Sequence, residues 1–204
     1  MRVALLLAIV LYAFLPEEVV PGPRYVLPAV EGALLVVLAV ISPRRRHGAL
    51  PHARVLAIVL VAIVSIANIV NLGLLVRELI RGGGLSGRTL IFSAIDIWVT
   101  NVIAFGFWYW ELDAGGPVER TREPSRRAGR DFLFPQQATP QSATRDWRPL
   151  FFDYLYTSFT NATAFSPTDT MPLSKAAKLL FMAQSAASLL TVALVAGRAV
   201  NILN

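Results

Sequence analysis

Long apolar runs separated by short charged loops dominate the first part of the chain. Four runs are predicted as membrane-spanning helices, because a hydrocarbon core about 30 Å thick requires roughly 20 apolar residues in a helix. They cover Val3 to Leu15, Tyr25 to Ser42, Val55 to Val76 and Thr89 to Trp110. The first run is short. We interpret it as a retained, tilted helix rather than a signal sequence, because no A-x-A-like cleavage site follows it.

The pattern changes after the fourth run. Residues 111–146 are rich in arginine, proline and glutamine, with almost no apolar periodicity, which predicts a polar extramembrane linker. Its apolar segment Asp131 to Pro135 is expected either to lie on the membrane surface or to form a local ordered contact. Residues 147–165 are aromatic, but too short and polar for a full span, and predict a re-entrant half-helix. A polar hairpin over 166–172 and a long apolar helix over 173–204 follow.

These segments predict an all-α integral membrane protein with about five transmembrane helices and one re-entrant half-helix before the last span. The expected units are a four-helix membrane region over 1–110, the linker over 111–146 and a last unit over 147–204. A composition of 55% hydrophobic and 16% charged residues, with a mean hydropathy of +0.56, agrees with this interpretation.

The composition also excludes several functions. The net charge of +6 comes from arginines in loops between apolar runs rather than on one exposed face, which argues against nucleic-acid binding. The sequence has no cysteine, which excludes disulfides and thiolate metal sites, and His47 and His52 lie in a basic loop. We therefore expect no metal site and no cofactor. A histidine–acid cluster and paired carboxylates within one span are both missing, so we do not expect an enzyme.

Six residues near the end of the chain stand in an informative order: Tyr156, Ser158, Thr160, Thr163, Asp169 and Pro172. An aromatic half-helix leads to a threonine-rich stretch, then to an Asp-x-x-Pro spacing and a long helix. This order resembles the pore region of two-span potassium channels and other tetrameric pore-loop cation channels. The resemblance implies a homotetramer whose ion pathway runs along Thr163, Ala164, Phe165, Ser166, Pro167, Thr168 and Asp169.

The stretch departs from a potassium filter because no glycine lies between Asp153 and Gly197. Glycines allow the backbone angles that point successive carbonyls at the ion, and Pro167 restricts its own backbone further. Side-chain oxygens of Thr163, Ser166, Thr168 and Asp169 are the available substitute, and selectivity among monovalent cations is then expected to be weak or different. Alternatively, Asp169 or Ser174 caps the last helix and binds no ion.

Two sets of polar residues interrupt the apolar helices. Gln184, Ser188, Thr191 and Arg198 fall on one face of the last helix and predict either a pore lining or hydrogen bonds between helices. Asp96 in the fourth span must face protein or water, and we expect hydrogen bonds to it from Asn68, Asn71 and Asn101. Asp96 then either relays protons or cations or holds the third and fourth helices together.

Arg44, Arg45, Arg46 and Arg54, with the arginines of the linker, predict that both basic loops are cytoplasmic. With five spans, the hairpin then enters from the cytoplasm. Potassium channels have the opposite arrangement, whereas ionotropic glutamate receptors have a hairpin that enters from this side. The order of segments also resembles an uncharacterised family of small bacterial membrane proteins, which implies the bacterial inner membrane and no particular activity.

The leading interpretation is a channel-like protein of the lipid bilayer, homotetrameric, that passes monovalent cations through an atypical filter. The alternatives are a non-conducting membrane scaffold and a proton-coupled transporter that uses Asp96.

Overall fold

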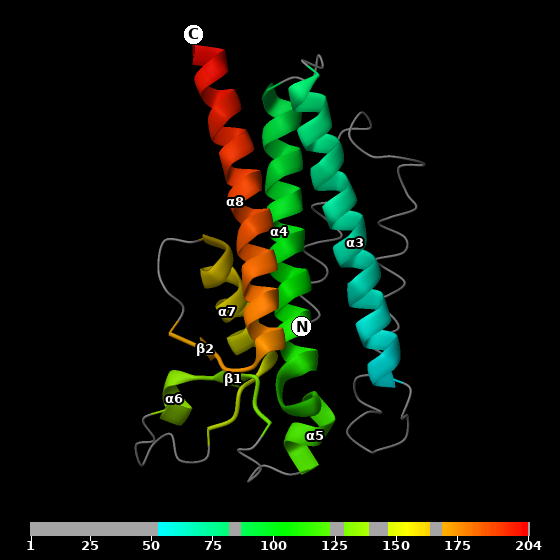
Figure 1. The fold of residues 1–204 in the computed structure, drawn as a ribbon, viewed down its shortest axis with the longest axis vertical. Coiled ribbons are helices and arrows are strands. Elements are labelled where there is room, and N and C mark those ends of the chain that lie inside the picture. The colour runs from blue at the N-terminus through cyan, green and yellow to red at the C-terminus, as the bar shows by residue number, and fades with distance from the viewer. Residues whose placement is uncertain (1–52, 82–86, 123–128, 139–146, 164–168, 204) are drawn as a thin grey trace.

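The computed structural model of the chain is mostly helical (Figure 1). It describes residues 53–81, 87–122, 129–138, 147–163 and 169–203. The first two predicted spans lie outside these ranges, and so do five of the residues predicted to form the ion pathway, namely Ala164, Phe165, Ser166, Pro167 and Thr168.

Three helices in the described ranges are long and apolar enough to cross a membrane. They are α3 (Ala53–Ile80), α4 (Gly87–Leu112) and α8 (Lys175–Leu203). They correspond to the predicted third, fourth and last spans, and α3 and α4 extend two or more residues beyond the predicted apolar runs at each end. Charged residues such as Arg54 and Arg77 fit into these extra turns because long side chains at helix ends reach away from the apolar surface.

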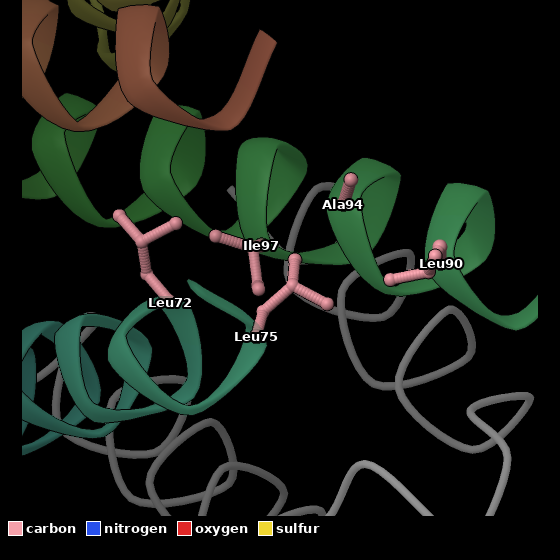
Figure 2. Packing of buried hydrophobic residues seen from close by; sticks show 5 residues of the cluster. All are labelled: Leu72, Leu75, Leu90, Ala94 and Ile97. Atoms are coloured by element: carbon pink, nitrogen blue, oxygen red, sulfur yellow. The ribbon is translucent and has the colours of Figure 1, made fainter. Parts of the chain in front are cut away.

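The three long helices lie side by side, with α4 in contact with both α3 and α8 (Figure 1). In its most apolar stretch, α4 is 67% buried, against 28% for α3 and 22% for α8, so α4 is the central helix of the described bundle. The contact between α3 and α4 includes an apolar cluster of Leu72, Leu75, Leu90, Ala94 and Ile97 (Figure 2). Their spacing of three or four residues places them on one face of each helix.

The shorter helix α7 (Phe151–Thr163) runs antiparallel to the second half of α4. Its first residue packs against Phe107 with ring centroids 4.6 Å apart, and further along Ser158 Oγ donates to the carbonyl oxygen of Val102 at 2.6 Å. The helix begins four residues later than predicted. Its start is marked by the backbone N–H of Leu150, which donates to Asp153 Oδ2 at 2.7 Å in the manner of a capping box.

Small elements gather at the end of the bundle where α4 ends (Figure 1). They are η2 (Asp113–Gly115), α5 (Pro117–Arg122), β1 (Phe132–Leu133), α6 (Pro135–Ala138) and β2 (Met171–Pro172). Strands β1 and β2 pair antiparallel, with Phe132 opposite Pro172. Phe132 and Phe134 are buried in a cluster with Tyr109, Tyr154 and Ala177. The apolar segment of the predicted linker therefore makes a local ordered contact, which is one of the two alternatives predicted for it.

Candidate functional site

Gln184 lies at the centre of the contact between α4, α7 and α8, and its side chain is fully buried. Its Oε1 accepts hydrogen bonds from Tyr109 Oη at 2.5 Å and from Asn161 Nδ2 at 2.8 Å. Its Nε2 donates to Ser158 at 2.6 Å (Oγ) and 2.9 Å (carbonyl oxygen). One side chain of α8 thus binds one residue of α4 and two residues of α7.

Further hydrogen bonds extend this centre along the helices. Asn101 Nδ2 donates to Ser188 Oγ at 2.9 Å and to the carbonyl oxygen of Gln184 at 3.3 Å. Ser185 Oγ donates to Asn161 Oδ1 at 3.2 Å. We call this group the polar seam: Asn101, Tyr109, Ser158, Asn161, Gln184, Ser185 and Ser188. Buried polar groups are costly unless they are hydrogen-bonded, so the seam favours one arrangement of the three helices over others.

The residues predicted as pore lining are buried within a single chain. Gln184, Ser188 and Thr191 are 0%, 1% and 2% exposed, and Thr191 Oγ1 donates to the carbonyl oxygen of Ala187 in its own helix. The contacts of the first two fit the alternative role, hydrogen bonding between helices. The side chain of Arg198 lies outside the described residues.

Two residues of the predicted ion pathway are described. Thr163 ends α7, is half-buried, and donates from Oγ1 to the carbonyl oxygen of Thr160 at 2.9 Å. Asp169 is exposed at the far end of the intervening segment. The N-terminal cap of α8 comes from Ser174, whose Oγ accepts the backbone N–H of Ala177 at 3.1 Å. Ser174 is one of the two residues predicted to cap this helix.

A second polar centre lies at the base of α7. Asp113 Oδ1 accepts the backbone N–H groups of Asp131 at 2.9 Å and Phe132 at 3.3 Å, and Oδ2 accepts the hydroxyl of Tyr154 at 2.5 Å. Burial raises the pKa of Tyr154 well above its usual range, and the neighbouring Arg120 opposes this shift. The phenol therefore stays protonated and continues to donate to the carboxylate.

Arg120 closes the same centre from the side of the linker. Its Nη1 donates to the carbonyl oxygen of Trp110, near the end of α4, at 2.8 Å and to that of Asp113 at 2.6 Å, which also accepts the backbone N–H of Gly116. Its guanidinium carbon lies 4.4 Å from the centroid of the Trp110 ring and 5.1 Å from that of Tyr154, in the range of a cation–π contact.

Asp96 does not receive the hydrogen bonds predicted for it. Asn68 Nδ2 donates to the carbonyl oxygen of Ile97 at 3.2 Å, and the amide of Asn101 belongs to the polar seam. Asn71 is half-buried. Asp96 itself is 4% exposed, and its Oδ1 has no hydrogen-bond partner. Both amides serve helix contacts instead: Asn68 of α3 reaches a backbone oxygen of α4, and Asn101 of α4 reaches a serine hydroxyl of α8.

Several members of these two centres were missed by reasoning from the sequence. Tyr109 was not singled out, because it stands between two tryptophans and its tyrosine hydroxyl suits a membrane interface equally well. The spacing of Asn161 and Ser158 indicates a shared role. They are three residues apart, so both lie on one face of a helix whose other face carries Phe152 and Tyr156. Asp113 and Arg120 read as ordinary linker charges.

The described residues include no group of three or more histidine, cysteine or acidic side chains placed to hold a metal ion. Comparisons of the chain with models of protein families, with curated proteins and with solved structures found no significant match.

Proposed function

We propose that the chain is an integral membrane protein of the channel type, which assembles as a homotetramer and passes monovalent cations through the segment between α7 and α8. The observation that carries the proposal is the course of the chain around α7. A half-length helix runs along the bundle, and the chain is back at the same end before α8 begins (Figure 1).

The contacts of α7 define this course. Trp110, near the end of α4, meets the first turn of α7 through Phe151, with ring centroids 6.0 Å apart. Trp98, three turns earlier in α4, meets Phe159, near the end of α7, at 5.6 Å. By Met171 the chain pairs with β1, beside the end of α4. In a bilayer that surrounds α3, α4 and α8, such a helix enters and leaves through one surface, which is the arrangement of a pore loop.

The outer faces of the long helices suit a lipid bilayer. Large apolar side chains are exposed along α3 and α8, among them Val59, Ile63, Ile66, Ile69, Leu179, Met182 and Leu189. Such a surface is unfavourable in water and fits lipid tails or a second copy of the chain.

The basic residues set the proposed orientation. Arg54, at the start of α3, donates to the carbonyl oxygen of Glu111 at 3.3 Å, so Arg54 lies at the same end of the described bundle as the start of the linker. Lys175 begins α8 at this end as well. An excess of lysine and arginine marks the cytoplasmic side. The hairpin would therefore enter a bacterial inner membrane from the cytoplasm.

The test is ion flux through purified protein in liposomes, together with its oligomeric state in detergent. We expect a tetramer that passes potassium and sodium, with flux reduced in Asp169→Ala because the variant removes an exposed carboxylate beside the proposed pathway. Glu78→Ala is the matched control, since it removes an acidic side chain near the other end of α3. A monomer or dimer that passes neither potassium nor sodium under any gradient would refute the proposal.

Two observations favour the alternatives. Gln184 and Ser188, predicted to line a pore, are buried and hydrogen-bonded to α7 and α4, as expected of a scaffold that does not conduct. The buried, unpartnered Oδ1 of Asp96 suits a proton-coupled transporter. Flux that requires a proton gradient and disappears in Asp96→Asn would identify a transporter, and intact tetramers without any flux would identify a scaffold.

A further inference from the structure

The last turn of α7 is where the polar seam is densest. Asn161 Nδ2 donates to Gln184 Oε1 at 2.8 Å and to the carbonyl oxygen of Phe181 at 3.2 Å. One turn earlier, Ser158 accepts from the Gln184 amide through both its hydroxyl and its carbonyl oxygen. Residues 164–168 of the predicted ion pathway follow Thr163, which comes two residues after Asn161.

We propose that Gln184 is a positioning residue: it holds the end of α7, and with it the point at which the filter-like segment leaves the helix, and it does not line the ion pathway. The consequence for ions rests on the proposed function. The claim that Gln184 holds the end of α7 is independent of it, because it concerns only how α7 is attached.

The chemistry of the side chain explains why glutamine serves here. Its amide offers an acceptor and a donor at once, so Tyr109 and Asn161 find an oxygen while Ser158 finds an N–H group. An apolar residue of similar size would leave all three partners buried without this bond. Unpaired polar groups in a low-dielectric interior are costly, and the end of α7 would relieve that cost by moving away from α8.

Two other contacts attach this turn to α8, and both are longer: Asn161 Nδ2 donates to the carbonyl oxygen of Phe181 at 3.2 Å, and Ser185 Oγ donates to Asn161 Oδ1 at 3.2 Å. Thr160 and Thr163 donate to carbonyl oxygens of α7 itself, which stabilises the helix without attaching it to a neighbour. Phe152 and Tyr156, on the opposite face, are exposed. The end of α7 is thus held by α4 through Ser158 and also by α8, and Gln184 makes the shortest of the side-chain hydrogen bonds between α7 and α8.

The experiment measures how accessible the end of α7 is. Because the chain has no cysteine, Thr163→Cys introduces a single reporter thiol whose labelling rate by a polar maleimide can be followed in full-length protein in liposomes. We expect Gln184→Leu and Asn161→Ala to raise this labelling rate about fivefold. Loss of a buried hydrogen bond shifts the local opening equilibrium of the end of α7 by about this factor. Gln184→Glu keeps the acceptor for Tyr109 and Asn161, and should raise the rate less.

Ser188→Ala is the matched control. It removes a buried polar group one turn along α8 whose partner, Asn101, belongs to α4 and not to α7. Its labelling rate should equal that of the reporter alone. Equal rates in all four variants, or an equal rise in Ser188→Ala, would overturn the proposal, because the labelling would then report general loosening or no role at all.

Ion flux separates this inference from the proposed function. If the parent chain conducts, Gln184→Leu should change the ratio of potassium to sodium flux, whereas Ser188→Ala should leave the ratio unchanged. If the parent chain does not conduct, the proposed function fails, while the labelling rates still decide whether Gln184 holds the end of α7.

Discussion

The two sides of α4 are held in different ways. Toward α3, the contact is mainly apolar, with Leu75 and Ile97 almost completely buried. Toward α7 and α8, it is built around the polar seam. Lipid tails are as apolar as leucine, so apolar burial alone discriminates weakly between a helix neighbour and lipid. A buried amide has no such substitute partner, and the seam therefore specifies its neighbours more sharply than the α3 contact does.

The length of α7 explains why the polar side is needed. At 13 residues it spans only about 20 Å, too short to cross a hydrocarbon core of about 30 Å. A spanning helix is held at its depth by both membrane surfaces, whereas a half-length helix is not. In the re-entrant arrangement that we propose, the bonds to Asp113 at one end and to Gln184 near the other supply that constraint for α7.

Among variants that test this difference between the two sides of α4, Asp113→Ala is expected to have the largest effect on stability. The variant leaves the hydroxyl of Tyr154 and the backbone N–H groups of Asp131 and Phe132 without their acceptor, and should lower the free energy of unfolding by about 3 kcal/mol. Thermal unfolding in detergent measures this loss. Asp113→Asn retains the Oδ1 acceptor and should lose less. A stability of Asp113→Ala equal to that of the parent chain would show that the base of α7 is not held by this carboxylate.

On the apolar side, Leu75→Ala should lower the free energy of unfolding by about 2 kcal/mol, because it opens a cavity between α3 and α4 (Figure 2). The same unfolding experiment applies. No residue of the seam belongs to the apolar cluster that contains Leu75, so the labelling rate at Thr163→Cys should not change. A rise in that rate would mean that the two sides of α4 are coupled, contrary to the distinction drawn above.

The smallest effects come from a pair of helix glycines. A Cβ at Gly106 would lie 3.3 Å from Leu155 Cα, so Gly106→Ala should push α7 away and destabilise the protein by about 1 kcal/mol. Gly73 on α3 has no atom within 4 Å of such a Cβ, and Gly73→Ala should stabilise by about 0.5 kcal/mol through helix propensity. Shifts of the unfolding midpoint in opposite directions from the parent chain would confirm the difference. An unchanged midpoint in Gly106→Ala would refute the close approach of α7 to α4.

The local features of the chain could be predicted from its sequence. The third, fourth and last spans follow from apolar runs, and the start of α8 follows from Ser174. The partners could not be predicted. Periodicity describes which residues share a face of one helix, but not which other helix meets that face. Tyr109 and Gln184 are separated by 75 residues, and nothing in the intervening pattern joins them. The burial of Phe132 and Phe134 likewise depends on the pairing of β1 with β2.

Gln184 illustrates the difference between what the sequence determines and what the tertiary structure decides. The sequence alone determines that an amide in an apolar helix must face protein or water, because lipid offers it no hydrogen bond. It leaves open whether the partner is a water-filled pathway or a neighbouring helix. Only the tertiary structure decides this, because the choice depends on which donors and acceptors the packing of α4 and α7 brings within about 3 Å of the side chain.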